Sequence, residues 1–336
     1  MGQLTPYFRG KMKSNIKTYL KGWIIPIVSG AVLLAVIIGL KITHDSIYAH
    51  TPRVFGATYM TMNNPYFSVL NESMREVIEA NGDILLTRDP AQSQERQNKQ
   101  ILEMIDEGME VLFANPVDWK AIKPALEACK KAKVAVFVVD TEVQDTENVV
   151  SVIQSDNYKA GELVAEDMMK RLPGGGNIVV LSHYNVQSTQ VRKNGFLDKI
   201  KGHDKYKIVA TSHQSSEIEV ANMEMDNIIK SGVKIDVVFG NNDPTAVGAL
   251  AAIEMNKLSE AGILVYGVDG SPYAKQLISK GYMVGTAAQH PVVMGRTAAN
   301  TAYDYLKNKK VDKNIIIDVD MITKDNLDKI NINEWQ

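Results

Sequence analysis

The feature that most constrains this chain is a repeated alternation of apolar runs with amphipathic stretches, which begins at residue 53. The apolar runs are rich in β-branched residues and predict strands at 53–60, 84–88, 110–114, 134–139, 149–153, 177–182, 207–211, 235–239, 263–268 and 282–287. The stretches between them predict helices near 67–81, 92–107, 118–132, 157–172, 189–201, 217–231, 244–258, 271–280 and 291–308. This alternation is typical of right-handed βαβ units, in which helices cover both faces of a mainly parallel sheet.

The number of strands predicts two sheets. Nine or ten strands are more than a single sheet of this kind ordinarily contains, and 336 residues are enough for two hydrophobic cores. A split near residue 155 gives two doubly wound α/β lobes, with Ser155, Asp156 and Asn157 at the crossing between them. Asp156 or Asn157 also suits the N-cap position of the helix that follows.

An uncharged apolar segment, residues 22–40, precedes this body and is flanked by Lys21 and Lys41. As a helix of 19 residues it would be about 28 Å long, close to the hydrocarbon thickness of a bilayer. The basic residues of segment 1–21 favour a cytoplasmic N-terminus, which places the body outside the membrane after a spacer at 41–52. The alternative is a cleavable signal peptide, whose apolar stretch is ordinarily shorter, about 7–15 residues. We therefore expect an uncleaved, single-pass transmembrane anchor.

The distribution of charge argues against nucleic acid as a partner. The net charge is −2, but residues 1–41 contain six basic residues and no acidic one, so the remaining 295 residues contain 31 basic and 39 acidic ones. Binding to phosphates needs clustered lysine and arginine, which an acidic body does not favour.

Sequence motifs for catalysis or metal binding are also lacking. The chain has one cysteine, Cys129, which excludes an internal disulfide and lies in a predicted amphipathic helix as a buried thiol. The six histidines have no metal-binding spacing, and no GxSxG nucleophile motif occurs. We therefore expect a protein that is not an enzyme and has no cofactor and no metal.

Polar residues follow the predicted strands at their C-terminal ends, where open α/β sheets bind ligands. These residues are Asn64, Asn115, Asp140, Asn242, Asp269 and Gln289, and they come from both halves of the body. Asparagine and aspartate are common in turns, so each position alone carries little information. Together, their amide and carboxylate groups are able to make paired hydrogen bonds to neighbouring hydroxyls.

A series of short motifs runs through the body from about residue 54 to 323. They are NPYF (64–67), NPVD (115–118), VVD (138–140), SDN (155–157), GNND (240–243), GVDG (267–270) and AAQ (287–289), with Arg192 shortly before Gly195 and Phe196. In this order and spacing they resemble the ribose-binding branch of the type I periplasmic binding proteins. The resemblance implies two lobes, 53–155 plus 290–312 and 156–289 plus 313–323, a tail at 324–336, and a hinge that includes Ser155, Asp156, Asn157 and Gln289.

The resemblance also implies a sugar-binding cleft. Tyr66 and Phe67 would stack on the sugar ring, since an aromatic face suits the C–H face of a sugar. The implied hydroxyl ligands are Asn64, Asn115, Asp140, Thr141, Arg192, Asn242, Asp269 and Gln289. Thr141 stands where the ribose binders have an arginine, and Ser216 aligns where they have a third aromatic residue. The sugar is therefore left open among pentoses, hexoses, polyols and sugar-derived signals.

These features together predict a binding protein that closes on a monosaccharide or polyol outside the membrane. It would present the ligand to an ABC permease or signal to a membrane histidine kinase, and the predicted anchor makes the two roles equally plausible. The alternatives are the body of a LacI-type repressor or an enzyme on this fold. A repressor needs a basic helix-turn-helix where this chain has its apolar segment.

Overall fold

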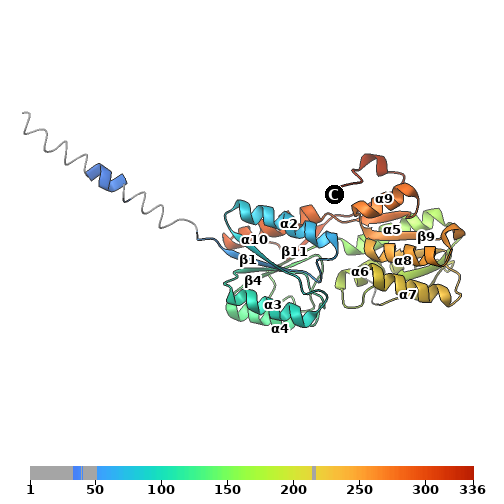
Figure 1. The fold of residues 1–336 in the computed structure, drawn as a ribbon, viewed down its shortest axis with the longest axis horizontal. Helices are drawn as coiled ribbons and strands as arrows, with labels where there is room; N and C mark the ends of the chain where they lie inside the picture. The colour runs from blue at the N-terminus through green and yellow to red at the C-terminus, as the bar shows by residue number, and fades with distance from the viewer. Residues whose placement is uncertain (1–32, 39, 41–50, 214–216) are drawn as a thin grey trace, which may run out of the picture. The chain divides into compact units, whose positions relative to one another are not determined.

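The computed structural model describes residues 33–38, 40, 51–213 and 217–336 (Figure 1). The chain divides into two units, residues 1–52 and Arg53–Gln336. In the first unit, residues 33–38 and 40 are helical and their apolar side chains are exposed. No helix within the described residues is long and apolar enough to span a bilayer, and most of the predicted span at 22–40 lies outside them.

The second unit contains two six-stranded sheets. The first has the order β11-β5-β4-β3-β1-β2 and all its pairs are parallel. Its strands are β1 (Val54–Thr58), β2 (Ile84–Arg88), β3 (Val111–Ala114), β4 (Ala135–Val139), β5 (Ser151–Ser155) and β11 (Asn314–Ile317). Its helices are α2 (Pro65–Ala80), α3 (Gln94–Asp106), α4 (Lys123–Ala132) and α10 (Pro291–Leu306). Helices α2 and α10 cover one face of the sheet, and α3 and α4 cover the other (Figure 1).

The second sheet has the order β12-β10-β9-β8-β6-β7, with β12 antiparallel to β10. Its strands are β6 (Gly176–Leu181), β7 (Tyr206–Thr211), β8 (Val237–Gly240), β9 (Leu264–Asp269), β10 (Gly285–Ala288) and β12 (Asp320–Thr323). Its helices are α5 (Asn157–Arg171), α6 (Gln187–Ile200), α7 (Ile218–Lys230), α8 (Asp243–Met255) and α9 (Pro272–Lys280), with short 3₁₀ turns η1 (Ser259–Ala261) and η2 (Leu327–Lys329). Helices α5 and α6 cover one face, and α7, α8 and α9 cover the other.

The two sheets place corresponding strands at corresponding positions. Strands β3 and β8 stand fourth in their sheets, β4 and β9 third, and β1 and β6 fifth. Since the helices between them are also equivalent, the lobes repeat one doubly wound plan. The predicted two-lobed α/β architecture is therefore confirmed.

The chain crosses between the lobes three times. It leaves the first sheet after Ser155, returns between β10 and α10 at Gln289, and crosses again at 318–319 between β11 and β12. The four predicted hinge residues lie at the first two crossings, where the Asp156 side chain caps α5 by accepting from Lys159 N at 2.9 Å. Their role in bending stays a prediction.

One boundary differs from the expectation. The resemblance places residues 313–323 in the second lobe, but β11 pairs with β5 of the first sheet and only β12 joins the second. The segment is thus divided between the lobes. Helix α4 also begins at residue 123 rather than 118, because the Asp118 carboxylate accepts from Lys120 N and Ala121 N and holds a turn there. Cys129 is buried, which raises the pKa of its thiol to about 12.

Candidate ligand cavity

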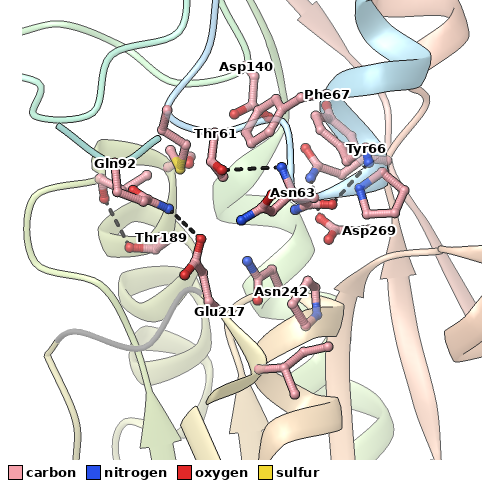
Figure 2. A pocket seen from close by; sticks show the side chains of 18 of the residues that line it. Thr61, Asn63, Tyr66, Phe67, Gln92, Asp140, Thr189, Glu217, Asn242 and Asp269 are labelled. Atoms are coloured by element: carbon pink, nitrogen blue, oxygen red, sulfur yellow. Dashed lines mark hydrogen bonds between the residues drawn. The ribbon is translucent and has the colours of Figure 1, made fainter. Parts of the chain in front are cut away.

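A cavity of about 340 Å³ is lined by both lobes (Figure 2). The first lobe contributes Met60, Thr61, Asn63, Asn64, Pro65, Tyr66, Phe67, Gln92 and Asp140. The second contributes Val186, Ser188, Thr189, Arg192, Glu217, Ile218, Glu219, Asn242, Pro244 and Asp269, with Gln289 at the crossing. Eight of the ten residues predicted to bind ligand line this cavity, while Asn115 and Thr141 do not.

Asn115 and Thr141 instead support the lining from behind. The Asn115 side chain donates to Asp140 Oδ2 at 2.9 Å and accepts from Met60 N at 3.0 Å. Thr141 Oγ1 accepts from Ser188 N of the second lobe at 3.0 Å. Both residues are buried, so their role in the structure is to fix lining residues.

The first turn of α2 positions the aromatic wall of the cavity, which consists of the rings of Tyr66 and Phe67. The Asn64 side chain accepts from Tyr66 N at 3.0 Å and caps the helix, and Pro65 occupies the first turn, where its missing N–H costs nothing. The rings of Tyr66 and Phe67 follow at once, with centroids 5.5 Å apart and an interplanar angle of 84°. The NPYF motif thus positions two adjacent rings.

Asp140 directly follows β4 with a positive φ of 68°. Its carboxylate accepts a hydrogen bond from the side-chain amide of Asn115 and lines the cavity. Burial raises the pKa of Asp140, while the charge of Arg192 and hydrogen bonds from Tyr66 and Asn115 oppose the rise. The carboxylate is held as an acceptor in a desolvated position.

Arg192 is the one cationic side chain among the described residues that line the cavity. It is 3% exposed and extends from α6. Its Nε donates to Asn157 Oδ1 and its Nη1 to the carbonyl of Asn241, both at 2.8 Å. These contacts fix the plane of the guanidinium. Burial raises the pKa of each of the three nearby aspartates, Asp140, Asp243 and Asp269, and the charge of Arg192 opposes that rise.

Asp269 ends β9, also with positive φ, at 137°. It accepts from Gln289 Nε2 at 2.8 Å, and Gln289 Oε1 is buried without a hydrogen-bond partner among the described residues. Burial and the charge of neighbouring Asp243 raise the pKa of Asp269 well above its ordinary value. Burial also raises the pKa of Asp243 to about 6, against hydrogen bonds from Thr286 and Ser271.

Contacts between the lobes close one side of the cavity. Gln92 Nε2 donates to Glu217 Oε1 at 3.0 Å, and Figure 2 shows these two side chains pointing toward one another. Another contact between the lobes joins Trp119 N to the carbonyl of Asn185 at 3.3 Å, at residues that do not line the cavity. Gln92 and Glu217 carry no local sequence signal, since each is an ordinary polar residue before a helix. Ser216, which aligned with a third aromatic, lies outside the described residues.

The cavity therefore combines two rings with fixed donors and acceptors. Asn242 caps α8 through Thr245 N at 2.8 Å and, with Asp269, faces the aromatic wall (Figure 2). Four lining carboxylates, Asp140, Asp269, Glu217 and Glu219, stand against one arginine. Such a lining suits an uncharged molecule with several hydrogen-bonding groups and disfavours an anion.

Comparison with known proteins gives consistent results. The ribose import binding protein of Bacillus subtilis is 29% identical over 263 residues, which cover 77% of this chain and 84% of that protein. An ABC transporter solute-binding protein from Mycobacterium smegmatis, solved with bound glycerol, is 26% identical with a TM-score of 0.78, covering 83% of this chain and 96% of that chain. The Caulobacter myo-inositol-binding protein, bound to myo-inositol, is 26% identical with a TM-score of 0.77, covering 83% and 97%.

The family model described as the periplasmic binding protein domain matches residues 55–310. This match spans both lobes and all eight predicted residues that line the cavity. It confirms the resemblance seen in the motifs, and the chain belongs to the periplasmic binding protein family.

Proposed function

We propose that this protein binds a neutral monosaccharide or polyol outside the cytoplasmic membrane by closing its two lobes around the ligand. The observation that carries this proposal is the cavity, in which the rings of Tyr66 and Phe67 face the polar groups of Asn242 and Asp269. Gln289 Oε1 supports it, because this buried oxygen has no hydrogen-bond partner in the described part of the chain and a ligand hydroxyl would satisfy it. The ribose, glycerol and myo-inositol in the names of related proteins belong to the same chemical class.

Closure follows from the division of the site. Each lobe alone offers part of the polar lining, so a ligand gains most when both contact it, and this differential affinity shifts the lobes toward the closed state. Ligand-binding roles are proposed for Asn64, Tyr66, Phe67, Asp140, Arg192, Asn242, Asp269 and Gln289. Asn115 and Thr141 would act indirectly, through Asp140 and Ser188.

A thermal-shift screen of the full chain in detergent tests this proposal. The panel would hold D-ribose, other pentoses, hexoses, xylitol, glycerol and myo-inositol, together with a sugar phosphate as an anionic control. A true ligand at 100 times its Kd stabilises a protein by about 2.7 kcal/mol. We expect one or more neutral compounds to raise Tm in the parent and not in Asp269→Ala. A panel with no shift, or equal shifts in both proteins, would contradict the proposal.

The downstream role would be delivery to an ABC permease or signalling to a membrane histidine kinase. A tether at residues 22–40 restricts how far the binding domain reaches, which favours signalling, whereas the names of the ribose and glycerol-bound relatives favour transport. Sequencing the amino terminus of the membrane-bound protein tests the tether. An intact start supports it, and a start near residue 50 rules it out. Neighbouring genes for a permease and ATPase, or for a kinase and response regulator, then separate the two roles.

A further inference from the structure

The segment after β12, residues 324–336, is anchored on the second lobe. Leu327 and Ile330 pack against the core formed by α7, α8 and α9. Asn326 ties the start of the segment to β12, because its side chain donates to the Met321 carbonyl at 2.8 Å and accepts from Thr323 N at 2.9 Å. The segment is therefore part of the folded second lobe.

Lys275 of α9 fixes the end of this segment. Its side chain is fully buried, and its ammonium donates to the carbonyl of Asn331 at 2.9 Å and to the carbonyl of Glu334. The side-chain amide of Gln336 bonds two groups in one orientation. Its oxygen accepts from Lys275 Nζ at 2.6 Å, and its nitrogen donates to the Gly270 carbonyl at 3.1 Å. A buried ammonium must be paired with hydrogen-bond acceptors, so Lys275 fixes the end of the segment against α9. Gly270 follows Asp269 of the cavity wall, so the segment contacts that wall from behind.

Trp335 connects the same segment to the first lobe. Its ring lies edge-on to Tyr66, with centroids 5.8 Å apart and an interplanar angle of 68°, and it packs against the first-lobe core. Tyr66 is 2% exposed, lines the cavity, and is held on another side by a contact of its hydroxyl with Met294 Sδ at 3.6 Å. Figure 1 marks the C-terminus between α2 and α9, in agreement with these contacts.

We propose that Trp335 is a positioning residue for the ligand site: it holds the ring of Tyr66 in place and links the two lobes across the cavity in the closed state. This inference rests on the proposed function for its ligand, and its geometry stands independently of it. The link adds to the three backbone crossings, and unlike them it is non-covalent. Opening the lobes would break it, so the contact favours closure and slows ligand release.

The first test is the dissociation rate of a panel sugar, D-ribose or whichever neutral compound shifts the parent, measured by stopped flow on the full chain in detergent. An edge-on aromatic pair contributes enough to change a population ratio roughly two- to tenfold. Trp335→Leu is expected to raise the dissociation rate by about that factor. Trp335→Phe, which keeps an aromatic ring, is expected to bring the rate most of the way back to that of the parent. A matched control is Tyr305→Leu, which removes a similar edge-on pair with Phe137, 6.0 Å apart, whose residues do not line the cavity.

An increase with Trp335→Leu alone supports the positioning role. Equal rates in the parent and Trp335→Leu, or equal increases in Trp335→Leu and Tyr305→Leu, would overturn it. A merely structural residue would lower Tm without changing the rate selectively.

The second test needs no ligand. Spin labels at Lys99→Cys on α3 and Lys230→Cys on α7, both exposed, report the distance between the lobes, and the buried Cys129 thiol stays unlabelled. Trp335→Leu is expected to shift the distribution of distances between the two labels toward longer values. Trp335→Phe is expected to give a distribution close to that of the parent. An unchanged distribution would overturn the inference. If no panel sugar binds the parent, the proposed function fails while this measurement still decides the role of Trp335.

Discussion

The two lobes place an aspartate at the same point of one repeated plan and surround it differently. Asp140 follows β4 and Asp269 ends β9, the third strand of each sheet, and both have positive φ and are buried. Asp140 stands beside the Asn115 amide and two rings. Asp269 stands beside a second carboxylate, Asp243, and beside Gln289, whose oxygen has no partner within the described part of the chain.

One topology thus produces two complementary cavity walls: the first wall is the part lined by the first lobe, and the second wall is the part lined by the second lobe. The first lobe supplies both aromatic rings that line the described cavity, and the second supplies its arginine. The first wall is fixed by hydrogen bonds of Asn64 and Asn115 within its own lobe, and by the Arg192 charge and the Trp335 ring from the second lobe. The second holds the carboxyl groups of Asp243 and Asp269 side by side and, within the described residues, a buried Gln289 oxygen without a hydrogen-bond partner, so it gains more when hydroxyl groups fill the cavity.

The largest effect is expected from Arg192→Met, because this arginine serves both walls. Its loss would leave Asp140, Asp243 and Asp269 without their buried counter-charge, at a cost of about 3–5 kcal/mol in the free energy of unfolding near pH 7.5. Affinity for the panel sugar is expected to fall at least about a hundredfold, as charged hydrogen bonds are lost.

Denaturant unfolding and calorimetric titration measure the two quantities. Arg192→Lys is the control, since it keeps the charge and loses the fork that bonds Asn157 and the Asn241 carbonyl. Affinity within about threefold of the parent in Arg192→Met would break the idea that one cation joins the two walls.

A smaller effect is expected from pH. The folded-state pKa of Asp243 is about 6, above the unfolded value near 3.9, so the folded protein binds more protons between these values. Stability from this group is complete below about pH 4, falls as pH rises through 6, and is level above that. Between pH 5 and 7.5 the free energy of unfolding should fall by about 1 kcal/mol on its account.

Thermal unfolding of the ligand-free protein from pH 5 to 8 measures this dependence. Asp243→Asn is expected to flatten it more than Asp140→Asn does, because the second lobe holds two neighbouring carboxylates and the first holds one. Parallel curves for the parent and Asp243→Asn would show that the carboxylate pair does not distinguish the lobes.

Most of the fold was predictable from the sequence, because helix and strand periods and caps are local properties. All ten predicted strands are present, while α2 begins at Pro65 rather than at 67, because the Asn64 side chain caps the helix there. Strands β11 and β12 were missed: each has four residues, and two residues separate them, so nothing local assigns them to different sheets. The turn at Asp118 was missed for a related reason, since a side-chain acceptor replaced the first helical turn.

The lining of the candidate cavity was predictable where residues follow strands and not where tertiary contacts assemble it. Asp140 and Asp269 stand at strand ends, which sequence identifies. Gln92 and Glu217 are 125 positions apart and meet only through folding. Asn115 and Thr141 follow strands too, but their side chains turn to Asp140 and Ser188, an orientation that no sequence pattern specifies.

Calorimetric titration of the full chain with the neutral sugar or polyol that most stabilises it tests the central claim most directly. The account predicts one binding site per chain in the parent, and an affinity at least about a hundredfold weaker in Asp269→Ala, whose carboxylate is part of the second wall. Undiminished affinity in Asp269→Ala, or tighter binding of the sugar phosphate than of every neutral compound, would contradict it.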